Sequence, residues 1–372
     1  MLMTTPLFIA CPKAIAGSGN TGTDQGFLTG RGISVPAPRI SINILPVNGF
    51  WPDQIYLLTN NIGREWVPDL PMNEYVVIQL PQPLSRLLFQ WSSGGNFNYI
   101  PDEWWTGTGS YKIEYSANST NGSNGTWIPA AAVQNNKVST RSFVITGSNI
   151  RWVRFMATGS PPGRDSANIE EFEIYDLTKC RPGTAWDTWG FIGDSITAGT
   201  FWRTHDGMPA FNELVHAGDP SRFPCMLNFG IGGDTSGDLL ARLQQALNDN
   251  PGIHFWAIGI GSNDNDARMY EDNLKAILDI LLSSGKQPII ARIPYRWDSE
   301  YHNELVQTLN EAVDRLTTNY KLPPGPDLYE FFIQNPEYLF DGLHPTSIIE
   351  QHGNAEGVKG IQRLWAEIAL KL

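Results

Sequence analysis

The stretch TWGFIGDSITAGT, residues 188–200, decides how the second half of the chain folds. Its apolar run ends at Gly193 and gives way to Asp194, Ser195 and small polar residues. This order predicts a buried strand that ends in a tight turn and leads into a helix. Ser195 at that turn is either a helix cap or a reactive hydroxyl, and the segments around it decide between the two.

After Trp189, short apolar runs alternate with longer amphipathic stretches. The runs predicted to be strands are WGFIG, MLNFG, HFWAIGIG, QPIIARI and DLYEFF, and the stretches predicted to be helices are SGDLLARLQQALND, YEDNLKAILDILLSSG and NELVQTLNEAVDRLTT. Alternating strands and helices favour a parallel sheet covered by helices, with sites at the carboxyl ends of the strands. We therefore expect an α/β domain over residues 188–372.

From about residue 10 to residue 177 the pattern is different. Short alternating runs rich in Val, Ile, Phe, Tyr and Trp are EYVVIQL, RLLFQWSS, YKIEYSAN, TRSFVIT, RWVRFMA and EFEIYDL. Runs of this kind predict an all-β sandwich. The polar stretch TKCRPGTAWDT, residues 178–188, marks the boundary. A chain of 372 residues exceeds one ordinary domain, and we expect two, residues 1–180 and residues 188–372.

Composition narrows the possible partners. Hydrophobic residues make up 41% of the chain and charged residues 17%, which is typical of a globular protein. The formal net charge of -12, with no run of Lys and Arg, disfavours nucleic acid. No segment approaches the roughly 20 apolar residues of a membrane span. The partner expected is a small molecule or a glycan, and the oligomeric state stays open.

The N-terminal segment and the cysteines indicate where the protein is located and whether it binds a metal. The start, MLMTTPLFIACPKAIAG, has no Lys or Arg ahead of its apolar patch, so it is a weak signal peptide. Cytoplasmic location and secretion with the leader removed both stay open. Cys11, Cys180 and Cys225 are too few for a disulfide scaffold and lack metal-ligand spacing. We expect no metal and no cofactor.

Polar and glycine-rich clusters follow the predicted strands of the second half. Ser195 follows WGFIG, Gly233 lies in GIGGDTS after MLNFG, and Asn263 lies in GSND after HFWAIGIG. Asp341 and His344 lie in DGLHPT, before the last helix. Because the carboxyl ends of parallel strands meet at one edge of a sheet, we expect these clusters to converge on one crevice.

These residue types are the ones that acyl transfer requires. A serine hydroxyl is a weak nucleophile until a base takes its proton, and a histidine oriented by a carboxylate is the usual base. His344 follows Asp341 by three residues, so the two side chains can pair. The backbone N–H groups of Ser195 and Gly233 and the amide of Asn263 can donate to an oxyanion. Glycine suits its position because a Cβ would hinder close approach of the substrate.

The same segments carry a resemblance to a known family. GDS at 193–195, GIGGDTS, GSND and DGLHP resemble, in order, the conserved blocks of the SGNH hydrolases, also called the GDSL esterase and lipase superfamily. The resemblance covers residues 188–372 and implies a three-layer, flavodoxin-like fold. It also implies hydrolysis of a carboxylic ester, often an acetyl or a lipid-like ester, with Ser195, Asp341 and His344 as the catalytic triad.

The first half is similar to a second family. EYVVIQL, YKIEYSANSTNGSNGTW, NIRWVRFMATG and ANIEEFEIYDL resemble the discoidin or galactose-binding-like jelly-roll β-sandwich. That resemblance implies a carbohydrate-binding module, and some members join their ends by a disulfide, which here would link Cys11 with Cys180. Buried free thiols are the other interpretation of these cysteines. Trp104, Trp105 and Trp51 are candidate platforms for a sugar ring, with core packing as the alternative.

Other classes of site fit these motifs less well. The α/β-hydrolase elbow G-x-S-x-G fails because Thr197 stands at its last glycine, and GIGGDTSG fits neither nucleotide-binding glycine motif. Asp194 as an aspartyl-phosphate nucleophile lacks a second acidic residue. The expected function is a serine esterase acting through an acyl-enzyme on short-chain or acetyl esters, including esters on carbohydrate. A short-chain esterase or lipase whose sandwich is purely structural, and a carbohydrate-binding protein with an inactive hydrolase domain, stay open as alternatives.

Overall fold

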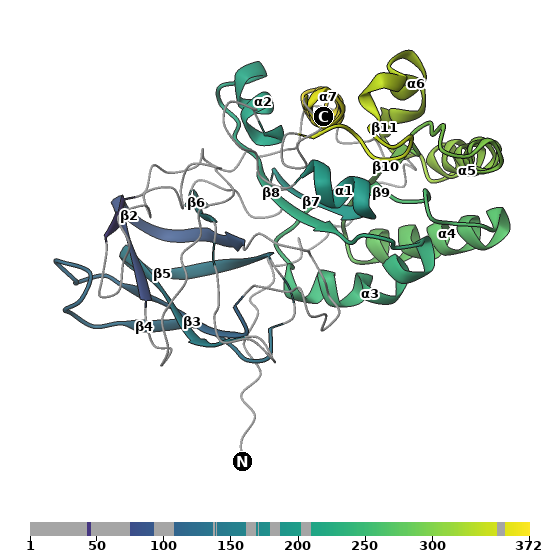
Figure 1. Cartoon of the computed structure of the whole chain (residues 1–372). Coiled ribbons are helices and arrows are strands. Elements are labelled where there is room, and N and C mark those ends of the chain that lie inside the picture. Colours follow the sequence, from purple (N-terminus) through teal and green to yellow (C-terminus); the bar gives the residue numbers. More distant parts are fainter. Residues whose placement is uncertain are drawn as a thin grey trace, which may run out of the picture.

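The computed structural model describes residues 43–45, 75–92, 108–136, 138, 140–160, 169, 171–178, 187–201, 210–347 and 354–372. Within these ranges the chain forms two sheets that lie side by side (Figure 1). The first is antiparallel and comes from the N-terminal half. The second is parallel, comes from the C-terminal half and is covered by helices. Among the helices of the described residues, none has the length and apolar composition needed to cross a membrane.

The antiparallel sheet has the strand order β1-β2-β5-β3-β4, with β6 paired to β2. Its strands are β1 (Asn43–Leu45), β2 (Tyr75–Ser92), β3 (Ser110–Ser116), β4 (Ile128–Val133), β5 (Thr140–Gly159) and β6 (Glu171–Asp176). The predicted strands EYVVIQL and RLLFQWSS belong to one long strand, β2. TRSFVIT and RWVRFMA likewise fuse into β5. The register between β2 and β5 shifts twice between Gln79 and Arg86.

An aromatic core shows that this sheet curls back on itself. Phe89 pairs with Phe143 across β2 and β5, and Phe155 lies twelve residues further along β5. A flat strand of that length spans about 40 Å, yet the rings of Phe89 and Phe155 are 6.5 Å apart. The described strands thus enclose a core, but they are hydrogen-bonded into one sheet. A sandwich of two separate sheets, and its galactose-binding-like family, stay predictions.

Several sequence predictions for this half fall on residues outside the described ranges. They are the platforms Trp51, Trp104 and Trp105 and the disulfide between Cys11 and Cys180. These stay predictions, as does the domain division at residues 1–180 and 188–372.

The parallel sheet has the strand order β11-β10-β9-β7-β8. Its strands are β7 (Thr188–Gly193), β8 (Cys225–Gly230), β9 (Phe255–Gly259), β10 (Gln287–Arg292) and β11 (Pro324–Asp327). Counted along the chain, this is the flavodoxin-like order 2-1-3-4-5, in which ligands bind at the carboxyl ends of the strands near the switch point. The predicted α/β fold with a parallel sheet is confirmed.

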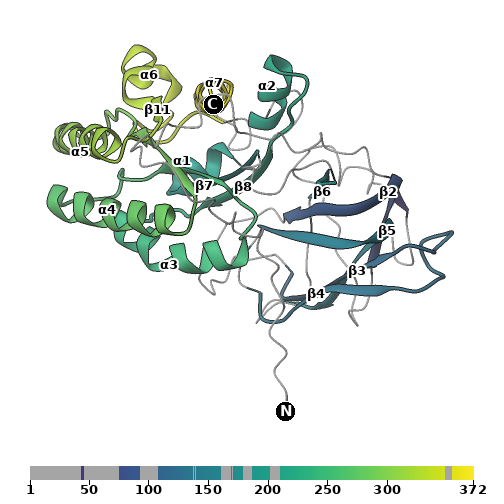
Figure 2. The ribbon, with the colours of Figure 1, turned by 180° about the vertical axis from the view of Figure 1, so that it is seen from behind.

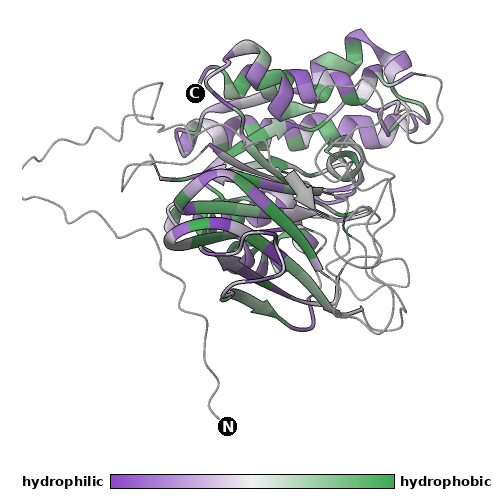
Figure 3. Cartoon of the chain, turned by 90° about the vertical axis from the view of Figure 1, so that its left-hand side faces the viewer, coloured by the Kyte–Doolittle hydropathy of each residue, from purple (hydrophilic) through white to green (hydrophobic). Residues whose placement is uncertain are grey.

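Helices pack on both faces of the parallel sheet. One face carries α3 (Ser236–Asp249), α4 (Ala267–Ser283) and α5 (Glu300–Asn319). The other carries α1 (Ser195–Thr200), α2 (Phe211–Gly218), α6 (Leu328–Gln334) and α7 (Glu356–Ala369). Every residue of β7 and β8 is buried, whereas Figure 3 shows that the helices carry hydrophilic as well as hydrophobic residues. Apolar stripes on the helices therefore pair with a sheet that is buried on both faces.

The segment DLYEFF was predicted as a strand, and that prediction is wrong. Only Asp327 belongs to the short strand β11, and the rest forms α6. The side chain of Asp327 caps the helix by accepting the backbone N–H of Glu330. Leu328 and Phe332, four residues apart, are the buried side chains. A spacing of four is the helical period, and in so short an apolar run it was mistaken for a buried strand.

The two sheets meet at the start of β8 and the end of α3. Gln90 of β2 donates to the backbone carbonyl of Met226 at 2.8 Å and accepts from the Cys225 thiol at 2.9 Å. The backbone N–H of Ser142 donates to the Asn250 side chain at 3.0 Å. Seen from behind, the antiparallel sheet lies beside β8, the edge strand (Figure 2). These contacts lie at the amino ends of the parallel strands, away from the edge where the polar clusters were predicted.

Candidate active site

Ser195 lies at the first position of helix α1, two residues after the end of β7. The cap of this helix is Asp194, whose carboxylate accepts the backbone N–H of Ile196 at 2.9 Å. The idea that Ser195 itself caps the helix is therefore wrong, because Asp194 already fills that role. Gly193 permits the tight turn, since a Cβ there would come within 1.9 Å of the Gly259 carbonyl oxygen.

Three side chains form a hydrogen-bonded row at this turn. The Ser195 Oγ lies 2.9 Å from the His344 Nε2, and the His344 Nδ1 lies 2.7 Å from the Asp341 Oδ2. Ser195 comes from the end of β7, whereas the other two come from the loop after the 3₁₀ turn Pro336–Tyr338. The structure thus brings together residues 149 positions apart.

The loop that carries Asp341 and His344 is closed by its own backbone. The Asp341 Oδ1 accepts the backbone N–H groups of Leu343 at 2.9 Å and His344 at 2.7 Å. Gly342 has φ +86°, the left-handed region, so only glycine is unstrained there. Its carbonyl accepts the backbone N–H of Trp297 at 2.9 Å. The loop is therefore held in place from within and from the segment after β10.

These hydrogen bonds affect the ionisation of the loop carboxylate. Partial burial acts to raise the pKa of Asp341, but hydrogen bonds from His344 and from the backbone N–H of Leu343 outweigh it and leave the pKa below its ordinary value. The carboxylate stays ionised in mildly acidic solution. It can therefore accept the ring N–H of His344 throughout the neutral range.

Gly233 and Asn263 lie beside the Ser195 turn, on the loops after β8 and β9. A Cβ on the neighbouring Gly232 would sit 4.0 Å from the Ser195 Cβ, which places that loop against the nucleophile turn. Gly233 has φ +81° and open space around a hypothetical Cβ. Glycine at position 233 is therefore explained by its backbone conformation and not by crowding from protein atoms.

The Asn263 amide is held in place by the loop after β8. Its Nδ2 donates to the backbone carbonyl of Asp234 at 3.0 Å. A side-chain amide has two N–H donors, so this bond orients the group and leaves the other N–H for a ligand. The neighbouring Asp264 carboxylate accepts hydrogen bonds from the hydroxyl and the backbone N–H of Ser236. These bonds tie the loop after β9 to the start of α3.

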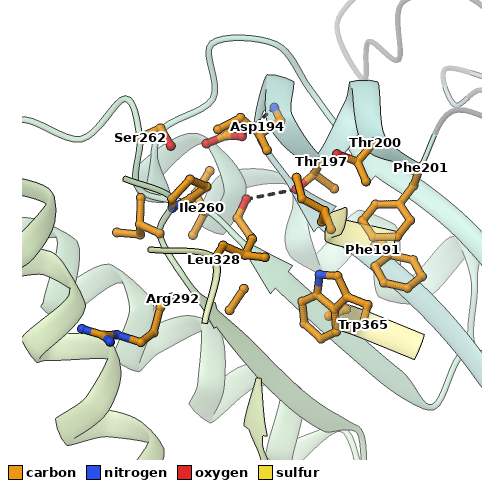
Figure 4. A pocket seen from close by; sticks show the side chains of 17 residues that line it. Phe191, Asp194, Thr197, Thr200, Phe201, Ile260, Ser262, Arg292, Leu328 and Trp365 are labelled. Carbon is orange, nitrogen blue, oxygen red and sulfur yellow. Dashed lines mark hydrogen bonds between the residues drawn. The ribbon is translucent and has the colours of Figure 1, made fainter. Parts of the chain in front are cut away.

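Asp194 faces a pocket beneath the nucleophile turn. Aromatic side chains of Phe191, Phe201 and Trp365 line one side of it (Figure 4). The dashed line in the same view is the bond from the Thr197 hydroxyl to the Gly259 carbonyl, 3.1 Å long. Burial in these surroundings raises the pKa of Asp194 to about 6, even though the backbone N–H of Ile196 acts to lower it.

Two arginines near the site were not predicted from the sequence. Arg242 pairs with Asp234 at 2.7 Å, and Arg296 donates to the Ser262 carbonyl at 2.7 Å while pairing with Asp298. Neither lies within a motif block, and a charged residue on an amphipathic helix or loop is ordinarily solvated. The sequence pattern does not show that these two side chains are buried. In the part of the chain that the structure describes, no three His, Cys, Asp or Glu side chains gather as a metal site.

A serine, a histidine and an aspartate lie in one hydrogen-bonded row at the carboxyl edge of a parallel sheet, an arrangement of the kind that serine hydrolases use. Comparison with known families agrees. Residues 191–351 match the model of the GDSL-like lipase/acylhydrolase family. The match supports a GDSL/SGNH hydrolase domain in this part of the chain, and the protein is a carboxylic ester hydrolase.

Similar proteins each cover between two fifths and one half of this chain. An arylesterase of Vibrio mimicus is 27% identical over 162 residues, which is 41% of this chain and 78% of that protein. Among solved structures, the lipase/acylhydrolase of Enterococcus faecalis is 23% identical and covers 47% of this chain and 95% of its own, with a TM-score of 0.36. The acetylxylan esterase Axe2 of Geobacillus stearothermophilus is 19% identical and covers 49% and 93%, with a TM-score of 0.39.

Proposed function

We propose that the protein is a serine esterase that works through an acyl-enzyme. The Ser195 Oγ attacks the ester carbonyl carbon while His344 Nε2 takes the hydroxyl proton. The tetrahedral intermediate collapses, and His344 returns the proton to the departing alcohol oxygen. Water then attacks the carbonyl carbon of the acyl-enzyme while His344 Nε2 takes a proton from it. The second tetrahedral intermediate collapses, the carboxylic acid leaves, and His344 returns the proton to the Ser195 Oγ.

The observation that carries this proposal is the row from Ser195 through His344 to Asp341, with distances of 2.9 Å and 2.7 Å. Both are within the reach that proton transfer needs. An inactive relative would not need all three groups aligned, so the geometry supports the catalytic alternative over a degenerate site.

We assign the oxyanion donors to the backbone N–H groups of Ser195 and Gly233 and to the Asn263 amide. Support comes from their placement on three loops at one edge of the sheet, with the Gly232–Gly233 turn beside Ser195. Charge that develops on the carbonyl oxygen is stabilised most by donors already fixed in place. The hydrogen bond that holds Asn263 on Asp234 provides such a fixed donor.

For the substrate, we propose short-chain and acetyl esters, including acetyl esters on carbohydrate. The arylesterase relative supports a small ester as the general class. The carbohydrate part rests on the resemblance of the first half to galactose-binding-like domains, because a binding module raises the local concentration of its ligand. A panel of p-nitrophenyl esters from acetate to palmitate, together with acetylated xylo-oligosaccharides, tests both parts. A preference for palmitate would overturn the short-chain assignment.

The test of the mechanism is Ser195→Ala in the full chain, with p-nitrophenyl acetate as substrate. Loss of the nucleophile lowers kcat by about 10⁴-fold or more in enzymes of this type. Ser283→Ala is the matched control, since that hydroxyl is exposed at the end of α4. A fluorophosphonate probe is expected to label wild type and the control, but not Ser195→Ala. Undiminished hydrolysis or labelling in Ser195→Ala contradicts the proposal.

A further inference from the structure

One buried ion pair contacts all three loops that carry the proposed oxyanion donors. Arg242 projects from α3, and only 9% of its side chain is exposed. Its partner Asp234 follows Gly233 directly and is 8% exposed. Burying two charges is costly unless their geometry is good and their remaining polar atoms are bonded. A pair placed here therefore needs an account of what it does.

The contacts of Arg242 join the turn after β7 to the loop after β8. Its Nε donates to the Asp234 Oδ2 at 2.7 Å, and its Nη2 donates to the Gly193 carbonyl at 3.0 Å. The same carbonyl also accepts the backbone N–H of Ile231 at 3.0 Å. Gly193 lies two residues before Ser195, so the guanidinium fixes the peptide that leads into the nucleophile turn.

Asp234 joins the loop after β8 to the loop after β9. Its carboxylate is held by Arg242, and its backbone carbonyl accepts the Asn263 amide at 3.0 Å. One arginine and one aspartate thus connect the segments that present the Ser195 N–H, the Gly233 N–H and the Asn263 amide. The planar fork of arginine reaches two acceptors at fixed angles, which the single ammonium of lysine does not.

We propose that Arg242, through Asp234, is a positioning residue that sets the relative placement of the three oxyanion donors. The inference rests on the proposed function. It assigns to Arg242 no contact with substrate. Loss of the fork is expected to displace the donors by a fraction of an ångström, which weakens binding of the transition state more than binding of the substrate.

The chain offers a matched control. Arg222 and Asp187 form a second buried pair, 2.9 Å apart, with 7% and 1% of their side chains exposed. Asp187 precedes β7, so this pair lies at the opposite end of that strand from Ser195. Arg222→Lys therefore reports the cost of disturbing a buried Arg–Asp pair with no link to the donors.

The experiment compares Arg242→Lys, Arg222→Lys and wild type in the full chain. For Arg242→Lys we expect kcat on p-nitrophenyl acetate to fall by about 10²-fold, the usual effect of losing one oxyanion donor, with KM changed less than about threefold. Phenylboronic acid binds covalently to the serine and places an oxygen among the donors, so its Ki should rise in parallel. Arg222→Lys should lower Tm to a similar degree and leave kcat and Ki unchanged.

Asp234→Asn provides a second variant if Arg242→Lys fails to fold. It keeps the backbone carbonyl that holds Asn263 and removes the charge, so a smaller parallel change in kcat and Ki is expected. A lowered Tm with unchanged kcat and Ki in these variants overturns the inference. Failure of the proposed function looks different, because wild type would then be inactive or Ser195→Ala would be active.

Discussion

Asp341 binds His344 twice: one carboxylate oxygen accepts its backbone N–H and the other its ring Nδ1, each at 2.7 Å. A single side chain thus fixes both the position of the histidine backbone and the rotation of its ring. The ring nitrogen that remains, Nε2, points to the Ser195 hydroxyl. Acid and base are only three residues apart, so their geometry is set within one loop.

Asp341→Asn should separate these two functions. An asparagine Oδ1 can still accept the backbone N–H, but its amide cannot accept the ring N–H, so His344 is expected to adopt the wrong tautomer. We expect kcat to fall by about 10²- to 10⁴-fold with a Tm close to that of wild type. Steady-state kinetics and calorimetry measure this. Asp314→Asn, on the exposed side of α5, is the control, and an Asp341→Asn rate within twofold of wild type would contradict the role.

Asp194→Asn should change how stability depends on pH. The pKa of Asp194 rises from its ordinary 3.8 to about 6 in the folded protein, chiefly through burial. The folded state therefore binds the proton more tightly, and stability falls as pH rises from about 4 to 6. The neutral amide can still accept the Ile196 N–H but does not titrate. We expect its advantage over wild type in unfolding free energy to grow by about 3 kcal/mol across that range.

Urea unfolding at pH 4, 5, 6 and 7 checks this prediction. The two proteins should differ least at pH 4 and most at pH 7. A constant difference at all four values would mean that Asp194 does not titrate in this range.

Asn263→Ala should remove one proposed oxyanion donor. We expect kcat to fall by about 10²- to 10³-fold, because a fixed amide aimed at a developing charge contributes that much in related chemistry. The KM for p-nitrophenyl acetate should change little. Asn248→Ala on the exposed face of α3 serves as the control, since its amide meets only Gln244. Equal kcat values for the two variants would exclude Asn263 from the oxyanion site.

Gly342→Ala should disturb the loop that carries the triad histidine. A Cβ there would lie 2.7 Å from the Asp298 backbone nitrogen and 2.9 Å from the Trp297 ring, at a φ of +86°. Gly285 also has positive φ, +69°, but open space around it. We expect Gly285→Ala to cost about 1 kcal/mol with full activity. Gly342→Ala should cost more and lower kcat, as measured by thermal melts and rates. Matching behaviour of the two variants would show that the contacts of Gly342 are unimportant.

Part of the site could be predicted from the sequence because Ser195 and Asn263 lie within a few residues of the ends of β7 and β9, two strands with a strong apolar pattern. Asp341 and His344 follow a 3₁₀ turn instead, and they were predicted from their spacing of three residues. Arg242 could not be predicted, since nothing in the sequence pattern shows that it and its partner Asp234, eight residues away, are buried together. The bends that join runs into β2 and β5 were also missed, because each half alternates like a separate strand.

The junction between the two sheets lies far from the nucleophile. Cys225, at the junction, opens β8 and pairs in register with Thr188, the first residue of β7. Ser195 comes two residues after the last residue of that strand, so the six residues of β7, roughly 20 Å of extended chain, lie between the junction and the nucleophile. The contacts that join the two sheets and the proposed site of hydrolysis therefore lie at opposite ends of the same strand, and a substitution in one can be made without touching the other.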